Sequence, residues 1–272
     1  MRAIASLLIA LLSGSAACAA EAPVSDVENR WNEAASGAVD YQLGGAYPPP
    51  PGVTIVVRDR KATPAPGLFS ICYVNGFQSQ PAETADWLER HPDLVLRGAD
   101  GRPVADPNWP DEVLLDTRTE ARRQALADIV GGWIDGCAEA GFDAVEFDNL
   151  DTWARADGLT LQDNLALAAL LIQRAHSRGL WAAQKNALDL GQAAIDAGFD
   201  FVISEECVVW RECDGYRRLY GDRHIDIEYI DDLDLAGFLA ECGAALPHLS
   251  VFRDRGLASP GSPEYTRAVC PT

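Results

Sequence analysis

The 272-residue sequence predicts an α/β fold, a (β/α)8 barrel of the TIM type in a single domain. Short apolar runs of strand length recur along the chain, and stretches with helical periodicity lie between several of them. Several of these runs end in carboxylates, amides or a lysine, and barrel enzymes carry their active sites at the carboxyl ends of the strands. A doubly wound open sheet is the alternative, but no glycine-rich phosphate loop follows the first run.

The strands are expected at the apolar runs, taken here in chain order. They read VDYQL from 39, TIVV from 54, FSICYV from 69, AVEF from 144, LWAA from 180, FVIS from 201, IDIEY from 225 and HLSVF from 248. Helices are expected over 119–140, 160–176 and 233–242, where apolar residues repeat at helical spacing. Thr119 and Thr160 are the candidate N-caps of the first two helices.

The beginning of the chain predicts export. Residues 1–20 carry a positive charge at Arg2, then an apolar run, then small residues, which is the pattern of a secretory signal peptide. The barrel domain then spans 21–272. Lipidation at Cys18 is the alternative to simple cleavage, and either route delivers a secreted or periplasmic protein. No later segment is long and apolar enough to span a membrane.

The charge balance limits the partners. There are 41 acidic and 22 basic residues, giving a formal net charge of -19. Such a chain disfavours nucleic acid and anionic membranes as partners and is compatible with a neutral or cationic ligand. Acidity that serves solubility alone is the other interpretation. No sequence feature calls for a second subunit, so a monomer is expected.

The cysteines predict disulfides. Seven occur, and Cys18 falls at the signal, so six remain for the folded domain, and an even number in an exported chain suggests pairing. The candidates comprise two residues that flank an expected loop, one on an expected buried helix stripe, one in the carboxyl tail, and one each on a strand and a helix face. The expected pairs are Cys207 with Cys213, Cys242 with Cys270 and, unless these two are simply buried thiols, Cys72 with Cys137.

No metal ion or other cofactor is expected. No C-x-x-C motif occurs, and the four histidines are scattered along the sequence.

Alternation along AVEFD predicts which acids face the barrel interior. Val145 and Phe147 share the face that the helices must cover, so Glu146 and Asp148 point inward. An inward acid is costly unless it is paired or solvated, so Asp148 is expected at the barrel mouth. Glu146 lies one layer deeper and needs a partner such as Lys185, in a role that either tunes the site or is purely structural.

Seven segments in this order resemble glycoside hydrolase family 114, the endo-α-1,4-polygalactosaminidases. They are YQLGG from 41, ICYVNG from 71, LLDTR from 114, GFDAVEFDNLD from 141, QKNALD from 184, SEECVVWREC from 204 and IEY from 228. The resemblance implies a (β/α)8 barrel that cleaves α-linked galactosamine polymers. It also implies that Asp148 is the nucleophile and that Glu205 is the acid/base. The family reads NEQC where this chain has Ser204 to Cys207, and Glu206 is the alternative acid/base.

Two carboxylates suit glycosidic cleavage independently of the resemblance, because one protonates the leaving oxygen while the other faces the anomeric carbon. Asn149 and Lys185 would keep Asp148 ionised, whereas apolar neighbours would raise the pKa of Glu205. We expect retention of anomeric configuration. Other residues at the strand ends and in the motifs are expected to bind the sugar: Gln42, Tyr73, Asn75, Asp116, Asn149, Asp151, Lys185, Asn186, Glu206, Glu228 and Tyr229.

Three tryptophans in expected loops are further candidates for contact with the sugar. Trp109, Trp153 and Trp210 either stack on sugar faces or pack the bases of loops. Two functions of other classes remain open: a barrel that binds exopolysaccharide without cutting it, and a metal-dependent hydrolase that uses Glu146 and Asp148 with Asp151.

Overall fold

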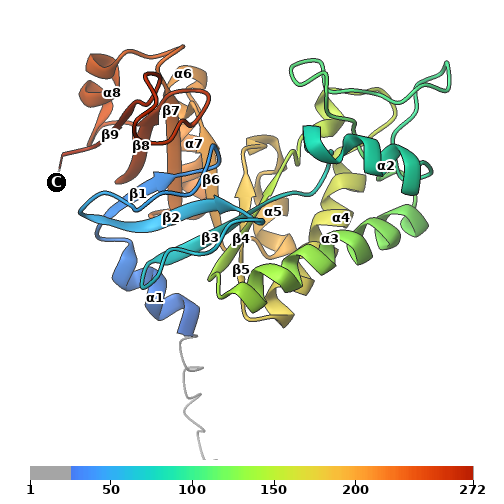
Figure 1. Cartoon of the computed structure of the whole chain (residues 1–272), viewed down its shortest axis with the longest axis horizontal. Helices are drawn as coiled ribbons and strands as arrows, with labels where there is room; N and C mark the ends of the chain where they lie inside the picture. Colours follow the sequence, from blue (N-terminus) through green and yellow to red (C-terminus); the bar gives the residue numbers. More distant parts are fainter. Residues whose placement is uncertain (1–25, 272) are drawn as a thin grey trace, which may run out of the picture.

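The computed structural model describes residues 26–271, and their strands form the wall of a barrel. Eight parallel strands follow one another in chain order, and a ninth pairs antiparallel with the eighth (Figure 1). All eight predicted strands are confirmed. The strands are β1 (Ala38–Tyr41), β2 (Val53–Asp59), β3 (Phe69–Asn75), β4 (Ala144–Asp148), β5 (Trp181–Lys185), β6 (Phe201–Glu205), β7 (His224–Tyr229), β8 (Leu249–Arg253) and β9 (Arg267–Val269).

Side-chain alternation divides the wall into two apolar layers. Inward residues such as Val39, Ile55 and Ile203 form the core inside the barrel. Outward residues such as Val145 and Phe147 pack instead with the helices. The predicted direction of AVEFD is therefore confirmed.

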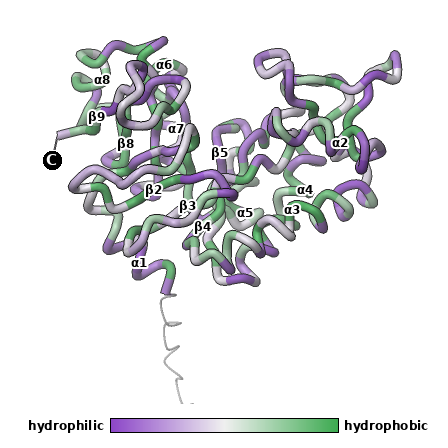
Figure 2. Tube along the Cα trace, viewed as in Figure 1, coloured by the Kyte–Doolittle hydropathy of each residue, from purple (hydrophilic) through white to green (hydrophobic). Residues whose placement is uncertain are grey.

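Figure 2 shows hydrophilic residues at many points of the long excursion between α2 (Thr84–Arg90) and α3 (Glu120–Ala140), with hydrophobic residues among them.

The helices lie outside the wall. Thr119 and Thr160 cap the two longest, accepting hydrogen bonds from Arg122 N and Asp163 N. The helices are α1 (Asp26–Ala34), α2 (Thr84–Arg90), α3 (Glu120–Ala140), α4 (Leu161–Ser177), α5 (Gln192–Ala197), α6 (Cys207–Trp210), α7 (Cys213–Tyr220) and α8 (Leu235–Glu241), with 3₁₀ turns at Pro81–Glu83, Thr152–Ala154 and Leu188–Leu190.

The third predicted helix is shorter than expected and less buried. It begins after Asp234, which caps it by accepting from Gly237 N. Phe238 is buried, but Leu235 and Leu239 are exposed. Within α8, the expected buried stripe is therefore confined to Phe238, which packs against Phe252 of β8.

Two connections depart from strict strand–helix alternation. Within residues 26–271, no helix lies between β1 and β2 or between β2 and β3. Loop residues cover the outer face of β2 there, where Ala65 and Leu68 pack on Val53 and Val56. This short loop therefore covers β2 in place of a helix.

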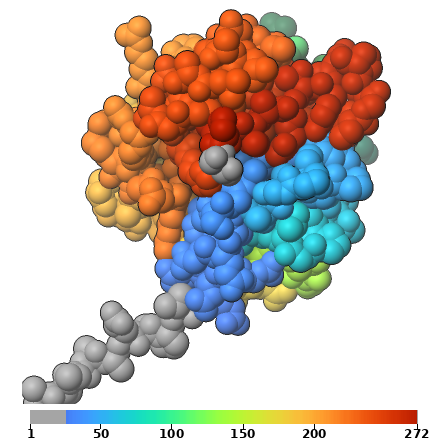
Figure 3. All heavy atoms as spheres, turned by 90° about the vertical axis from the view of Figure 1, so that its left-hand side faces the viewer, coloured from blue at the N-terminus to red at the C-terminus, as the bar shows by residue number. Residues whose placement is uncertain are grey.

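The barrel closes through arginine side chains. The first and last strands of the parallel set, β1 and β8, lie side by side, but no backbone ladder joins them among the described residues. Arg267 of β9 donates to Val39 O at 3.0 Å and to Asp40 Oδ1 at 3.0 Å. Arg253 of β8 donates to Tyr41 O. Figure 3 shows the C-terminal part of the chain packed directly against the N-terminal part at this seam.

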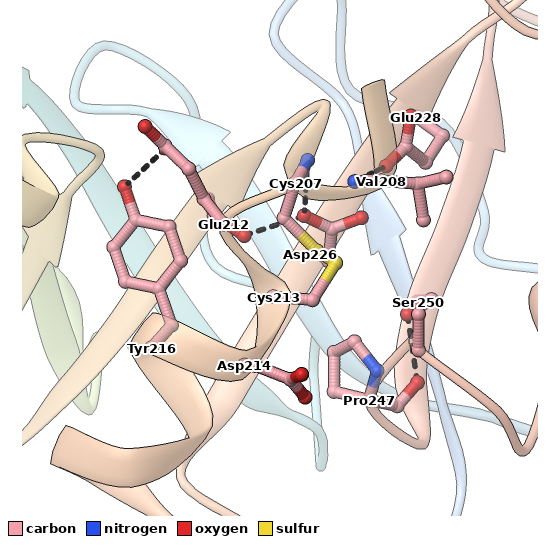
Figure 4. The surroundings of a disulfide bond; sticks show 12 residues. Cys207, Val208, Glu212, Cys213, Asp214, Tyr216, Asp226, Glu228, Pro247 and Ser250 are labelled. Atoms are coloured by element: carbon pink, nitrogen blue, oxygen red, sulfur yellow. Dashed lines mark hydrogen bonds between the residues drawn. A yellow bond between two sulfur atoms is a disulfide. The ribbon is translucent and has the colours of Figure 1, made fainter. Parts of the chain in front are cut away.

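All three expected disulfides are present. Cys72 of β3 bonds Cys137 of α3, which ties the wall to its longest helix. Cys242, just after α8, bonds Cys270 near the end of β9. The third bond, between the cysteines at positions 207 and 213, joins the first turns of α6 and α7 where a loop alone was expected (Figure 4).

Within residues 26–271, no helix has both the length and the apolar character required to cross a membrane. The predicted signal peptide and Cys18 lie outside the described residues.

Candidate active site

Three neighbouring strands deliver two carboxylates and a lysine to one cavity of about 300 Å³. Asp148, Lys185 and Glu205 stand at the carboxyl ends of β4, β5 and β6, each on the inward side of its strand. The Lys185 ammonium lies 3.6 Å from Asp148 Oδ1 and 3.2 Å from Glu205 Oε2. The two carboxylates therefore flank one buried cation at the barrel mouth.

These distances also limit how far apart the two carboxylates are. The nearest oxygens of Asp148 and Glu205 are separated by no more than the sum of the two, about 7 Å. Retaining glycosidases hold their carboxyl groups about 5–5.5 Å apart and inverting enzymes about 6.5–9.5 Å apart. The limit on the nearest oxygens is compatible with the retaining range and also reaches the lower end of the inverting range.

Two hydrogen-bond donors hold the Asp148 carboxylate in place. Tyr73 Oη donates to Oδ2 at 2.7 Å, and Asn149 N donates to Oδ1 at 2.8 Å. The side chain is 19% exposed, so it faces the cavity instead of the core. A carboxylate held in this way is oriented and open to a ligand on one side.

Glu205 is held as firmly. Tyr229 Oη donates to Oε1 at 2.5 Å, and Asn186 Nδ2 donates to Oε2 at 3.1 Å. Asn186 also accepts from Glu205 N at 2.7 Å, so one amide fixes both the backbone and the side chain.

The pKa of Glu205 differs from the expectation. Burial, the largest influence, would raise this pKa, but Lys185 and the hydrogen bonds from Tyr229 and Asn186 outweigh it and hold the pKa below its usual value. The apolar neighbours that predicted a raised pKa turn away in α6, where Trp210 is 66% exposed. The resting carboxyl is therefore surrounded by groups that favour its ionised form.

A backbone turn of the same kind follows each of these three strands. Asn149, Asn186 and Glu206 have φ values of 64°, 49° and 58°. This left-handed region is tolerated by asparagine and is strained for glutamate, and such strain gathers at functional sites. Asn149 and Asn186 line the cavity at the barrel mouth, whereas Glu206 does not.

Glu206 has a different environment from Glu205. Its Oε1 accepts from Arg255 Nη2 at 2.7 Å, and the same guanidinium contacts Asp232 and stacks on the ring of Tyr229 at 4.1 Å. Glu206 does not line the cavity that holds Lys185, whereas Glu205 does.

A second cavity of about 310 Å³ adjoins the first. Both are lined by Asp151, Asn186 and Glu205, so Glu205 stands at their boundary. Trp153 and Trp210 line the second cavity, and Trp109, which is 54% exposed, lines the first.

The structure brings six of the eleven expected sugar-binding residues into the first cavity and one into the second. The six are Tyr73, Asn149, Asp151, Lys185, Asn186 and Tyr229, and the one is Glu206.

The other four lie elsewhere. Gln42 points outward and bonds Asp40 and Arg58 near the seam. Glu228 is buried beneath α6 and accepts from Val208 N at 2.8 Å (Figure 4).

Asp116 is buried and pairs with Arg118. Asn75 lies behind the cavity wall, where its Oδ1 accepts from Asn149.

Several cavity residues were not predicted. Tyr41 lies two residues after Val39 on β1 and faces inward as Val39 does, so strand alternation could have identified it. Glu112, Arg155 and Arg255 come from loops, where no period in the sequence marks them.

The carboxylates do not form an obvious metal site. Lys185 lies 3.5 Å from Glu146 and 3.6 Å from Asp148, so its charge opposes a divalent cation there, and Asp151 pairs with Arg155. One group at metal-ligand spacing, Cys207 with His224 and Asp226, includes a cysteine that is already in a disulfide.

The fold resembles that of solved glycosidases. The structure of Aspergillus fumigatus Ega3 in complex with galactosamine has a TM-score of 0.69 and 19% identity, covering 92% of this chain and 100% of that one. The glycoside hydrolase domain of PelA from Pseudomonas aeruginosa has a TM-score of 0.57 and 14% identity, covering 83% of this chain and 97% of the other. No curated protein matches the sequence. The sequence matches glycoside-hydrolase family GH114 over residues 20–265, and the chain belongs to that family.

Proposed function

We propose that the protein is a secreted hydrolase that cleaves α-1,4-linked galactosamine-containing polysaccharide within the chain, with retention of configuration. The observation that carries the proposal is the pair Asp148 and Glu205, held on either side of Lys185 at the mouth of the barrel. Membership of a glycoside hydrolase family and the galactosamine bound to Ega3 support the substrate class.

The proposed chemistry proceeds in two displacements. The first displacement occurs in the fraction of the enzyme in which Glu205 has taken up a proton from solvent. An oxygen of Asp148 bonds to the anomeric carbon, the glycosidic bond breaks, and Glu205 gives that proton to the leaving oxygen. In the second, a water oxygen bonds to the anomeric carbon, Glu205 takes the water's proton, and Asp148 leaves as a carboxylate. The limit of about 7 Å between the nearest oxygens of the two carboxylates is compatible with retention.

The paired cavities support cleavage inside a polymer. Glu205 stands where the two meet, so a sugar chain can continue on both sides of the broken bond. The exposed Trp109 and Trp210 provide aromatic faces for sugars beyond the central one. An exo-acting enzyme would instead need one end closed.

The charge supports a substrate with free amino groups. The formal net charge is -19, and Asp189 and Glu212 line the second cavity, where no lysine or arginine appears among the lining residues. Part of the acidity near the site is neutralised, because Asp151 pairs with Arg155 and Glu206 with Arg255. A partly deacetylated polymer suits this mixture better than a fully cationic one.

The six cysteines of the described residues form three disulfides, which is typical of proteins that fold in oxidising compartments. Together with the predicted signal peptide, this supports a secreted or periplasmic location.

The test is product analysis on α-1,4-galactosamine polymers that are fully acetylated, partly deacetylated or fully deacetylated. We expect the partly deacetylated polymer to give oligosaccharides of mixed length early in the reaction, identified by mass spectrometry. NMR of fresh product should show the α reducing end first. If β appears first, the enzyme inverts and Asp148 is not the nucleophile. Binding to a polymer without any release of products would favour the non-catalytic binding protein.

A further inference from the structure

The Lys185 ammonium is enclosed by more carboxylates than the two that the proposed reaction uses. The side chain is 2% exposed, and its Nζ lies 3.5 Å from Glu146 Oε1 in addition to its contacts with Asp148 and Glu205. Burial alone would lower the pKa of Lys185, but the three carboxylates hold it well above its usual value. Lys185 therefore stays an ammonium.

Glu146 is the deepest of the three carboxylates and is completely buried. Its Oε1 accepts from Tyr41 Oη at 2.7 Å, and the same hydroxyl lies 3.4 Å from Lys185 Nζ. Its Oε2 has no hydrogen-bond partner among the described residues. A buried carboxyl oxygen without a partner destabilises the fold, so stability does not explain why an acid stands here.

The neighbouring strands show that the position does not require an acid. Glu146 is in register with Tyr73 on one side and Ala183 on the other, and both belong to the apolar interior. A valine or alanine would fill this layer without a buried charge. What an acid adds is its contact with Lys185.

We propose that Glu146 is a positioning residue that holds the Lys185 ammonium beneath Asp148 and Glu205, and so sets the charge against which Glu205 gains and loses its proton. The inference rests on the proposed role of Glu205. It names a third carboxyl that touches no substrate and acts through the lysine.

The charge balance shows how the device works. Burial above all raises the pKa of Glu146 to about 7, with Lys185 opposing it and Asp148 and Glu205 adding to it. When Glu146 is neutral, Lys185 acts fully on Glu205 and favours its ionised form. When Glu146 is ionised, it takes up part of that positive charge, and Glu205 holds a proton more easily. Because the pKa of Glu205 lies below its usual value, Glu205 stays ionised while Glu146 gains or loses its proton near pH 7. The charge of each carboxyl acts on the other through Lys185.

The inward side chains that face this cluster come from six strands. They are Tyr41 of β1, Tyr73 of β3, Asp148 of β4, Lys185 of β5, Glu205 of β6 and Tyr229 of β7. The tyrosines remain neutral donors, because burial raises the pKa of each well above its usual value. Near neutral pH, the group that changes charge is Glu146.

The direct test is an infrared titration of the Glu146 carboxyl, whose band is assigned by its loss in Glu146→Gln. In Glu205→Gln, the pH at which Glu146 takes up its proton should fall by about one unit, because Lys185 no longer shares its charge with Glu205. Asp226→Asn is the matched control: it removes a buried acid from the outward side of β7 that contacts Ser204 and Cys207 instead of Lys185. It should leave the titration unchanged.

A kinetic readout follows the same change. The kcat/KM of Glu146→Gln on the polymer should match the wild type below about pH 6, where wild-type Glu146 is also neutral. Above about pH 7 it should fall below the wild type, because only the wild type then carries the charge that helps Glu205 hold a proton. A purely structural role would lower the rate equally at every pH. An aryl galactosaminide with a dinitrophenyl leaving group needs no proton from Glu205, so its rate should stay within about twofold of the wild type.

Each outcome decides something. An unchanged Glu146 titration in folded Glu205→Gln overturns the inference. If Glu146→Gln does not fold, Tyr41→Phe assigns the band instead, because it removes the donor to Glu146 and should raise the pH at which that carboxyl takes up its proton. A wild-type protein that cleaves no polymer overturns the proposed function, whereas the infrared titration still decides the role of Glu146.

Discussion

Lys185 is the residue on which the candidate chemistry converges. A single ammonium orients two carboxylates from the strands on either side, so loss of any one partner changes the charge felt by the other two. The tyrosines add direction: Tyr73 donates to Asp148 and Tyr229 donates to Glu205. Each carboxylate is thus fixed before a sugar arrives.

The roles of the two carboxylates can be separated by substitution. Asp148→Asn and Glu205→Gln should each reduce polymer turnover by about 10²–10⁴-fold, with little change in binding or melting temperature. Glu206→Gln is the matched control, an identical change one residue later at a side chain held by Arg255, and it should lose less than about tenfold. Turnover is measured by the release of reducing ends. If Glu206→Gln is the damaging change, the acid/base role belongs to Glu206.

Parity along a strand determines which polar residues could be assigned from sequence. It places Asp148 and Glu205 inward, and it would also have placed Gln42 and Glu228 outward, because Tyr41 and Tyr229 beside them face the interior. Arg255 could not be found in this way, since it lies in a loop and reaches Glu206 across 49 residues of sequence. Strand alternation predicts which face of the sheet a side chain occupies, but it does not predict what a side chain in a loop contacts.

At the scale of elements, the three disulfides fasten the outer layer at three points. The bonds span 65, 28 and 6 residues, and each joins a helix or its end to another element. The cysteine count predicted that bonds exist, and helical spacing placed Cys242 near the right surface. Its partner Cys270 follows the short strand β9 directly. That strand has only three residues, so no periodicity in the sequence reveals it.

Removal of the disulfides should rank by the length of chain that each one closes. Paired Cys→Ala variants should lower the free energy of unfolding by about 4 kcal/mol for the 65-residue span, about 3.5 kcal/mol for the 28-residue span and about 2 kcal/mol for the 6-residue span. Urea denaturation monitored by circular dichroism measures each loss. If removal of the shortest span lowers the free energy of unfolding more than removal of the longest, interactions around each bond outweigh chain entropy.

At the scale of the whole molecule, burial shifts the pKa values of two acids and of a histidine in opposite directions. Burial, foremost, raises the pKa of Glu228 from its ordinary 4.5 to about 7, and raises that of Asp226 beside it. His224, close by, has its pKa lowered to about 3 by burial and by Arg217. The barrel therefore carries neutral groups in its outer layer that would be charged in water.

The pH dependence of stability tests this. Folded Glu228 binds its proton more tightly than the unfolded chain does, so its stabilisation is complete below about pH 4.5 and is lost as the pH rises through about 7. Glu228→Gln cannot ionise and should gain about 2 kcal/mol relative to the wild type between pH 5 and pH 8. Urea midpoints at the two pH values give the difference. A constant difference between the proteins would show that Glu228 is ionised at both.

The arginine seam has a consequence for the order in which the chain folds. Successive strands of the wall are far closer in sequence, whereas Arg253 meets Tyr41 across 212 residues and Arg267 meets Val39 across 228. Closing so long a loop carries a large entropy loss that only a nearly complete wall can offset. We therefore expect the sheet to assemble strand by strand and the seam to form after the transition state. Weakening these arginine contacts would accelerate unfolding and leave the rate of folding almost unchanged.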